Sequence, residues 1–191
     1  MNNYQLINRI KKIVDIEINK KDTDKILSIF KPAIQDKNIK IITQGEVCRN
    51  IYFVLEGAIR TFTLNDNGRE YTRTIAIEND FISNISSFKN STPSDEFIEK
   101  TKFLYANHED IYNLISTNSL LKDIYIEIIE SFNIQNVNKI NKILTLSDHD
   151  KLNFLYKNKK DFIKRFPDRI NASFLSMSRE NYSRYKKIVI F

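Results

Sequence analysis

Short apolar runs separated by glycine-containing turns dominate the middle of the chain. The runs are rich in β-branched and aromatic residues and are Ile39 to Thr43, Ile51 to Leu55, Ala58 to Leu64, Tyr71 to Ile77 and Phe103 to Ala106. The three glycines of the chain, Gly45, Gly57 and Gly68, lie between such runs at spacings of 12 and 11 residues. This pattern predicts a small β-sandwich or barrel, in which each glycine serves a turn that needs a positive φ.

Helical spacings of apolar residues flank this β region on both sides. Residues 4–30 predict two helices, with Asp22 or Thr23 as the N-cap of the second. Residues 118–146 predict one long helix, and seven of the ten residues from Leu120 to Ile129 are apolar or aromatic, which is too many for a single buried stripe. We therefore expect a second buried face that pairs with another copy of the chain, whereas the alternative is a helix enclosed by its own domain. The candidates for that face are Leu121, Ile124, Tyr125, Ile128, Phe132, Val137, Ile140 and Leu144.

The last 45 residues predict shorter helices that are separated by turns. A helical region from Ser147 to about Arg165 ends at Phe166-Pro167, and two further helices are expected at Arg169 to Leu175 and at Ser178 to about Ile188. The spacing of the last two helices is typical of a helix-turn-helix, with the small Ala172 where the helices cross and Ser178 as the N-cap.

The last predicted helix has two different faces. Tyr182, Tyr185 and Val189 share one face by their spacing and are expected to pack on the core. The other face carries hydrogen-bonding side chains, which are Arg179, Glu180, Ser183, Arg184 and Lys187. Arginine can bond a guanine edge and glutamate can accept from a cytosine amino group, so this face suits readout of the DNA major groove. The alternative is a solvated face with a Glu180–Arg184 ion pair.

The net charge of +6 is concentrated in the C-terminal part of the chain. Residues 118–191 hold 14 Lys and Arg against 8 Asp and Glu, whereas residues 1–117 hold equal numbers of each sign. This division indicates either a nucleic-acid-facing module joined to a neutral one or a Lys-rich solvated surface.

Several other classes of protein are disfavoured by the composition. One cysteine, Cys48, allows no intramolecular disulfide and cannot supply an iron–sulfur cluster, and it is expected to be an ordinary small side chain. His108 and His149 have no metal-ligand spacing and are expected at the surface or at helix caps, so we predict no metal site and no cofactor. No motif of an enzyme, no membrane-length apolar run and no export signal occurs, so we expect a cytoplasmic protein that is not an enzyme.

Several of these motifs together resemble the Crp/Fnr family of bacterial transcription regulators, in particular its Bacteroidetes-like branch. The resemblance rests on Gln44 to Gly57, Asn65 to Glu70, Asn79 to Ile82 and Thr92 to Ser94, and on the string Ser178-Arg-Glu-x-x-x-Arg184, which is similar to the recognition helix of cyclic-AMP-binding members. It implies an α+β protein with an N-terminal jelly roll (a double-stranded β-helix) of the cyclic-nucleotide-binding type and flanking helices.

The resemblance also implies a division of labour along the chain. Residues 1–117 would be the sensor domain, residues 118–146 a connecting and dimerisation helix, and residues 147–191 a winged-helix-like helix-turn-helix domain. The implied partners are a second copy of the chain, palindromic double-stranded DNA and RNA polymerase, with no membrane, and the effector is unknown. The implied DNA-binding residues are Ser178, Arg179, Glu180, Ser183, Arg184 and Lys187.

The sequence departs from that family in both modules. Ser83 and Asn84 replace the Gly-Glu pair of cyclic-AMP-binding members, and no arginine occurs between Arg73 and Arg165 to hold a cyclic phosphate, with Lys89 as the nearby cation. We therefore expect no response to cyclic AMP. In the C-terminal module, Asn171, Ser176 and Tyr185 replace a usual apolar residue, a usual turn glycine and a usual aliphatic residue. An alternative function is therefore a ligand-binding or interaction protein that keeps the sensor fold without specific DNA binding.

Overall fold

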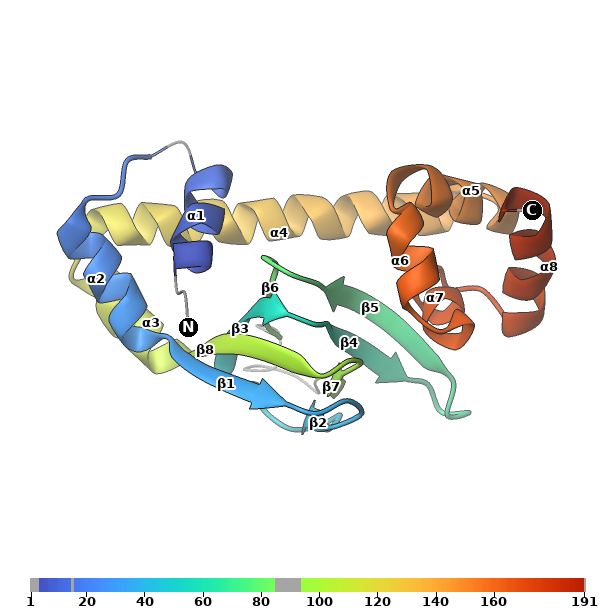
Figure 1. Cartoon of the computed structure of the whole chain (residues 1–191), viewed down its shortest axis with the longest axis horizontal. Coiled ribbons are helices and arrows are strands. Elements are labelled where there is room, and N and C mark those ends of the chain that lie inside the picture. The colour runs from blue at the N-terminus through green and yellow to red at the C-terminus, as the bar shows by residue number, and fades with distance from the viewer. Residues whose placement is uncertain (1–3, 15, 85–93, 191) are drawn as a thin grey trace. The chain divides into compact units, whose positions relative to one another are not determined.

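The computed structural model describes residues 4–14, 16–84 and 94–190, and its elements are drawn in Figure 1. The helices are α1 (Tyr4–Ile13), α2 (Lys20–Ile29), α3 (His108–Ser116), α4 (Ser119–Thr145), α5 (Asp148–Asn158), α6 (Lys160–Arg165), α7 (Asp168–Phe174) and α8 (Arg179–Ile190). The strands are β1 (Lys31–Gln35), β2 (Lys40–Ile42), β3 (Asn50–Glu56), β4 (Ile59–Leu64), β5 (Glu70–Ala76), β6 (Phe81–Ile82), β7 (Ser94–Phe97) and β8 (Thr101–Asn107).

By their contacts, these elements form two compact units. The first unit comprises Met1–Thr61 and Ile75–Asn133, and the second comprises Phe62–Thr74 and Ile134–Phe191. The second unit therefore contains the α5–α8 helices together with the turn between β4 and β5. The assignment of residues 1–117, 118–146 and 147–191 to sensing, dimerisation and DNA binding concerns function and stays a prediction.

Two four-stranded sheets make up the β region, with strand orders β1-β8-β3-β6 and β2-β7-β4-β5. Strand β3 pairs antiparallel with β8 and with β6, and β8 also pairs antiparallel with β1. A cluster of side chains from both sheets, centred on Tyr52, Phe97 and Phe103, fills the space between them. The expected β-sandwich is therefore confirmed, and the five predicted strands appear within two residues of their expected ends.

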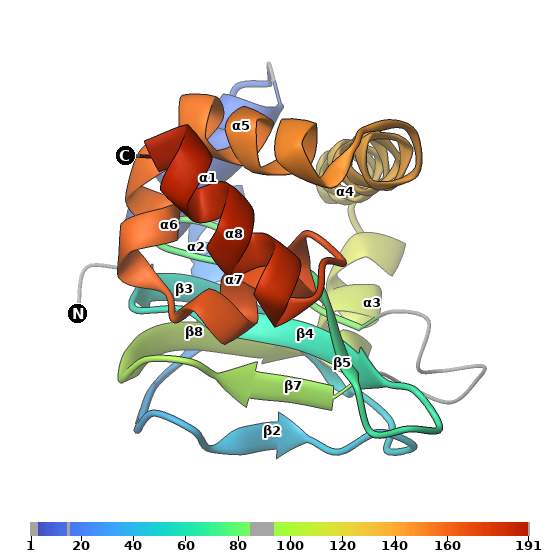
Figure 2. The same ribbon diagram turned by 90° about the vertical axis from the view of Figure 1, so that its right-hand side faces the viewer.

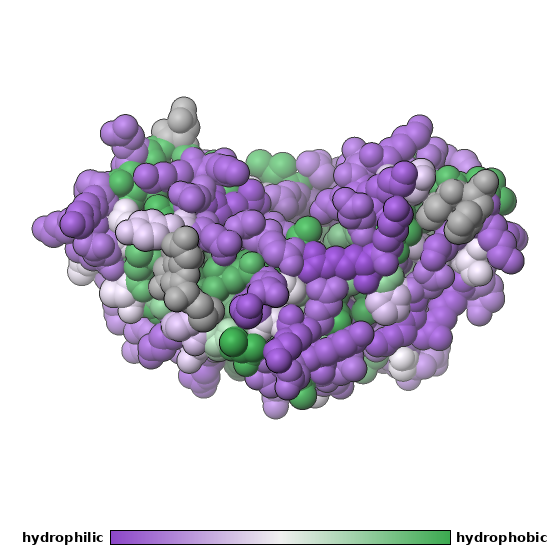
Figure 3. Space-filling model, in the orientation of Figure 1, coloured by the Kyte–Doolittle hydropathy of each residue, from purple (hydrophilic) through white to green (hydrophobic). Residues whose placement is uncertain are grey.

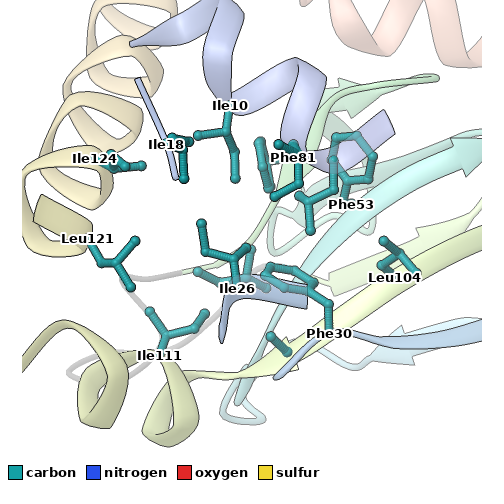
Figure 4. Packing of buried hydrophobic residues seen from close by; sticks show 14 of the residues in the cluster. Ile10, Ile18, Ile26, Phe30, Phe53, Phe81, Leu104, Ile111, Leu121 and Ile124 are labelled. Atoms are coloured by element: carbon teal, nitrogen blue, oxygen red, sulfur yellow. The ribbon is translucent and has the colours of Figure 1, made fainter. Parts of the chain in front are cut away.

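Strand β3 is apolar from Ile51 to Leu55 because both of its faces are covered there. Tyr52 and Val54 point between the sheets, whereas Ile51 and Phe53 point to the opposite face. That opposite face packs against helices α1 to α4, and Figure 4 shows Ile10, Ile111 and Leu121 of these helices lining one apolar interior with Phe53. The N-terminal part of α4 is thus built into the core of the first unit.

The N-terminus of α2 corrects one expectation. Its N-cap is Asn19, whose side-chain oxygen accepts a hydrogen bond from Asp22 N at 2.9 Å, so neither Asp22 nor Thr23 is the cap. Asp22 instead lies in the first turn, buried, where its carboxylate accepts from Asn19 Nδ2 and from Asn118 Nδ2, each at 2.8 Å. Sequence alone does not distinguish these N-cap candidates, because asparagine and aspartate cap helices equally well.

Helix α4 also divides differently from the expectation. Leu121 and Ile124 are buried, and Tyr125, Ile128 and Phe132 pack on the core of the first unit. Leu121 and Ile124 are therefore wrong as partner-facing candidates, whereas Tyr125, Ile128 and Phe132 are half-buried and their part in a dimer stays a prediction. The other three candidates and two further apolar residues are exposed, namely Ile126 at 42%, Ile134 at 61%, Val137 at 54%, Ile140 at 54% and Leu144 at 76%. None of the described helices is both long and apolar enough to cross a membrane.

Candidate nucleic-acid interface

Helices α5 to α8 enclose a small core of their own in the second unit. Its buried side chains are Leu152, Leu155, Phe162, Ile163, Phe166, Ile170, Ala172, Leu175, Met177 and Tyr182. Figure 2 shows α7 and α8 following each other across a short turn. The two expected helices are thus confirmed to within two residues. Every regular element described between Ile134 and Ile190 is a helix, so that range contains no strand pair of a winged helix.

The turn between α7 and α8 explains one unusual residue. Ser176 has a φ of +56°, in the left-handed region that a glycine adopts without strain. Its backbone N–H donates to Ser173 O at 3.2 Å, and Met177 N donates to Ala172 O at 2.9 Å, which closes the end of α7. Ser176 therefore adopts the left-handed conformation that is usual for glycine at this turn, and its backbone is strained.

Asn171 is explained by the proline that precedes α7. The carbonyl of Ile163 lies in the last turn of α6, where its usual donor would be the N–H of residue 167, but that residue is Pro167. The Asn171 side chain, which is completely buried, donates instead, from Nδ2 to Ile163 O at 3.2 Å and to Phe166 O at 2.9 Å. The amide thus supplies hydrogen bonds that an apolar residue could not.

Helix α8 begins with the expected cap. The hydroxyl of Ser178 accepts from Asn181 N at 3.1 Å, so this side chain holds the helix N-terminus in addition to lying at the proposed interface. Hydrogen bonds from the backbone and from Ser178 lower the pKa of the exposed Glu180 carboxyl. Glu180 is therefore ionised at neutral pH and available as a hydrogen-bond acceptor.

The two faces of α8 follow the predicted division. Tyr182 is completely buried, and Tyr185 and Val189 are half-buried. The opposite face exposes the polar residues Arg179, Glu180, Ser183, Arg184 and Lys187. The structure therefore brings together five of the six predicted residues as exposed groups on one helix, with Ser178 half-buried at its start. The Glu180–Arg184 ion pair of the alternative interpretation does not form among the described residues.

Lys186 and Arg184 have partners within the second unit. The ammonium of Lys186 lies 2.7 Å from Asp168 Oδ1, so it ties α8 to the start of α7. A guanidinium nitrogen of Arg184 donates to Asn181 Oδ1 at 3.2 Å and to Tyr185 OH at 3.1 Å. Periodicity places both side chains on the helix but cannot identify these partners.

The first residues of β5 contact α7 and the C-terminal half of α4 within the second unit. Ser173 Oγ accepts from Thr72 N at 2.8 Å and donates to Glu70 O at 3.0 Å. Lys139 Nζ donates to Thr72 O at 3.0 Å and lies 3.8 Å from the centre of the Phe174 ring. Burial, with smaller contributions from the positive charges of Arg73 and Lys159, lowers the pKa of Lys139 to about 7. Neither Ser173 nor Lys139 was identified from the sequence.

The interior of the first unit contains charged groups that are already paired. Arg60 is 1% exposed, and its guanidinium lies 2.5 Å from Glu96 Oε2. Asp95, also 1% exposed, accepts a hydrogen bond from Thr61 Oγ1 at 2.7 Å. Asp95 also contributes to the raised pKa of Tyr52, which lies between the sheets, although burial is the larger cause.

The positions expected to replace a nucleotide site have structural partners. Ser83 Oγ donates to Asn50 O at 3.1 Å and lies 3.2 Å from His108 Nε2, and Asn84 is buried. His108 is only 3% exposed, and burial lowers its pKa, so the expectation of a surface or capping residue is wrong for it. It follows the N-cap Asn107 at the start of α3, and its ring stacks on the ring of Tyr112 with centroids 6.4 Å apart. Lys89 and Thr92-Pro93 lie outside the described residues.

Cys48 and His149 are the two remaining isolated residues that the sequence analysis considers. Cys48 is completely buried, its thiol donates to Asn50 O at 3.2 Å, and burial raises its pKa. His149 is partly exposed in the first turn of α5, where its Nδ1 lies 3.2 Å from Asp150 Oδ1. Among the described residues, no group of three or more His, Cys, Asp or Glu could hold a metal ion.

Comparison with known proteins identifies part of this chain. Residues 36–118 match the cyclic nucleotide-binding domain. The match covers β2 to β8 and α3, which is the region built around the two sheets. None of the curated proteins compared with the chain matches it.

Solved structures with the same fold include transcription regulators. One is a putative Crp/Fnr-family regulator from Eubacterium rectale, with a TM-score of 0.69 and 17% identity over 90% of this chain and 83% of that one. The c-di-GMP responsive global regulator CLP from Xanthomonas campestris has a TM-score of 0.67 and 15% identity over 90% of this chain and 92% of that one. The catabolite activator protein of Thermus thermophilus has a TM-score of 0.54 and 18% identity over 91% and 84%. These similarities establish the fold.

Proposed function

We propose that this protein is a homodimeric DNA-binding transcription regulator of the Crp/Fnr type. In this proposal α7 and α8 form a helix-turn-helix, and α8 is the recognition helix. The observation that carries the proposal is the division of α8, because a buried Tyr182 anchors one face while Arg179, Glu180 and Arg184 lie exposed on the other. Exposed guanidinium groups and a carboxylate near the N-terminus of such a helix can hydrogen-bond the acceptors and donors on base edges.

The proposed roles differ along α8. Arg179, Glu180, Ser183 and Arg184 lie toward its N-terminal part and would face base edges, with Ser178 capping the helix beside them. Lys187, which is exposed farther along, would contact phosphate. The neighbouring Lys186 is instead assigned to structure because of its ion pair with Asp168.

Selection of binding sites from random duplexes tests the proposal, with an enriched palindrome as the expected result. On the selected site, Arg184→Ala should weaken binding by about 1 to 3 kcal/mol and relax the preference at one base position. The control is Lys187→Ala, which should weaken binding to all sequences alike and reduce the salt slope by about one unit. If no sequence is enriched, the alternative of a ligand-binding or interaction protein becomes the better account.

The proposed dimer uses the exposed apolar stripe of α4 in the second unit. Ile134, Val137, Ile140 and Leu144 recur at spacings of three and four residues, so they share one side of the helix. Exposed side chains of this size at such spacing are typical of a helix that pairs with another helix.

Ile140→Glu tests this dimer because it places a charge in the paired stripe. The variant should be a folded monomer in sedimentation, whereas the wild type should be a dimer. Ile34→Glu is the matched control, since Ile34 is 52% exposed and lies on the edge strand β1 of the first unit. If Ile140→Glu is a folded dimer, the dimer interface does not include this stripe of α4.

We further propose that the protein does not respond to cyclic AMP. The buried guanidinium of Arg60 is engaged with Glu96, and the buried Asp95 carboxylate would repel a cyclic phosphate between the sheets. Ser83 is bonded to the backbone of Asn50. Calorimetric titration with cyclic AMP should give no heat of binding, and binding at micromolar concentrations would contradict the proposal.

A further inference from the structure

A hydrogen bond links the first turn of α5 to α8. Asn181 Nδ2 donates to Asp148 Oδ2 at 2.9 Å, across 33 residues of sequence. The other oxygen of the same carboxylate, Oδ1, accepts from Lys151 Nζ at 3.2 Å. The side chain of Lys151 is only 12% exposed and that of Asp148 26%, so this carboxylate is held on both oxygens at the junction of two helices.

This link determines the direction of the Asn181 amide. A carboxylate can only accept hydrogen bonds, so Asp148 takes the NH2 end of the amide. The oxygen of Asn181 must then face the other way, where it accepts from a guanidinium nitrogen of Arg184 at 3.2 Å. Asp148 therefore controls which end of the amide Arg184 meets.

A second contact supports the same guanidinium. The hydroxyl of Tyr185 accepts from that nitrogen at 3.1 Å, and the guanidinium carbon lies 4.7 Å from the centre of the Tyr185 ring. That ring contacts the ring of His149 edge-on, with centroids 5.9 Å apart. The first turn of α5 thus touches both side chains that hold Arg184, through Asp148 and through His149.

We propose that Asp148 and Asn181 are positioning residues that orient the Arg184 guanidinium for base readout, so that the sequence specificity of α8 depends on α5. This inference rests on the proposed function. A guanidinium that is already oriented loses less conformational freedom on binding and favours the one base edge that matches its fork. Loss of the orientation should therefore reduce discrimination between sequences more than it reduces binding to phosphate.

Asp148→Asn is the decisive variant because it keeps the shape of the side chain while adding an NH2 donor. Asn181 can then present either end to residue 148, and its oxygen is no longer directed to Arg184. The readout is the ratio of affinities for the selected site and for a site changed at the position whose preference Arg184→Ala relaxes. We expect Asp148→Asn to lower this ratio about tenfold, which corresponds to the loss of one hydrogen bond to a charged group. In the double variant with Arg184→Ala, it should lower the ratio no further.

Ser147→Ala is the matched control. Ser147 caps the same helix by accepting from Asp150 N at 3.2 Å, so the variant destabilises α5 without touching Asn181. Its discrimination ratio should equal that of the wild type. An equal fall in both variants would assign the effect to the stability of α5 and overturn the proposal.

A measurement without DNA separates this inference from the proposed function. The side-chain NH2 resonances of Asn181 in a 1H–15N spectrum should shift in Asp148→Asn and stay in place in Ser147→Ala. If they do not shift in Asp148→Asn, the hydrogen bond is absent in solution and the positioning role is wrong, whatever the protein binds. Suppose instead that the resonances shift and that Arg184→Ala relaxes the sequence specificity. If Asp148→Asn then leaves the specificity unchanged, only the positioning role is wrong and the proposed function stands. If no DNA sequence is selected, the proposed function fails, and the role in base readout with it.

Discussion

The first unit keeps charged side chains inside with their partners, whereas the second unit displays the charges of α8 at its surface. Arg60 and Glu96 form a buried ion pair between β4 and β7, and Asp22 accepts two side-chain hydrogen bonds in the first turn of α2. On α8, by contrast, Arg179 and Glu180 are exposed. A buried pair is committed to the fold because removing either partner leaves an uncompensated charge. The exposed charges of α8 carry no such commitment, although most of the match to a known domain lies in the first unit. On the face seen in Figure 3, hydrophilic residues predominate and hydrophobic residues form small groups.

The largest expected effect contrasts a crowded glycine with an open one. A Cβ on Gly57 would lie 2.6 Å from Lys100 O and 2.8 Å from Thr101 Cα, at a φ of +99°, whereas one on Gly68, at a φ of +73°, meets nothing within 4 Å. Gly57→Ala should lower the free energy of unfolding by about 3 to 5 kcal/mol, through backbone strain and overpacking together. Gly68→Ala should cost about 1 to 2 kcal/mol, from strain alone. Urea denaturation measures both, and equal costs would show that the two turns are equally tolerant.

A pH titration tests the buried cation of the second unit. Because the pKa of Lys139 is about 7 in the folded protein and 10.5 is the ordinary value, the unfolded chain binds more protons between these limits. The free energy of unfolding should therefore rise with pH from about 7 to 10, by up to about 1.4 kcal/mol per pH unit from this group. Lys139→Met should remove that part of the slope. Thermal unfolding at several pH values measures this slope. If stability depends on pH in the same way in the wild type and in Lys139→Met, the lowered pKa of Lys139 is contradicted.

The smallest expected effect is a gain in stability at the α7–α8 turn. Ser176→Gly removes the strain of the left-handed backbone, but it also makes the unfolded chain more flexible, which costs some conformational entropy on folding. Because the relief of strain is the larger effect, the variant should stabilise the second unit by about 0.5 to 1 kcal/mol. Ser178→Ala, two residues farther on, should have the opposite sign and cost about 1 kcal/mol because it removes the cap of α8. Loss of stability in Ser176→Gly would mean that the serine side chain contributes more than its backbone costs.

Periodicity predicted the elements whose pattern is set by burial on one face or by a turn. The strands around Gly57 and the last two helices fall into this class, as does Ser178 as a cap. Strand β1 was missed because Pro32 disfavours a strand, yet β1 lies at the edge of its sheet, where a proline is tolerated.

The remaining features depend on contacts between segments that are distant in sequence. Apolar spacing along α4 could not show that Ile128 packs on its own unit while Ile140 is exposed, since both have the same chemistry. The partners of Arg184 were hidden for the same reason, because Asp148 reaches it through Asn181 from another helix. The exposed residues of α8 could be predicted, but not what holds them in place.

The amide of Asn171 makes two positions of the chain dependent on each other during evolution. With Pro167 present, replacing Asn171 by leucine leaves the carbonyls of Ile163 and Phe166 buried without these donors, at a cost of about 1 to 3 kcal/mol each. If another residue replaces Pro167, its N–H becomes a possible donor to Ile163 O, and the amide is no longer needed there. A lineage can therefore restore an apolar residue at position 171 at a lower cost after it has lost the proline, because only the carbonyl of Phe166 then loses its donor. The order of the two substitutions is thus constrained, and sequence positions 167 and 171 should vary together among relatives of this protein.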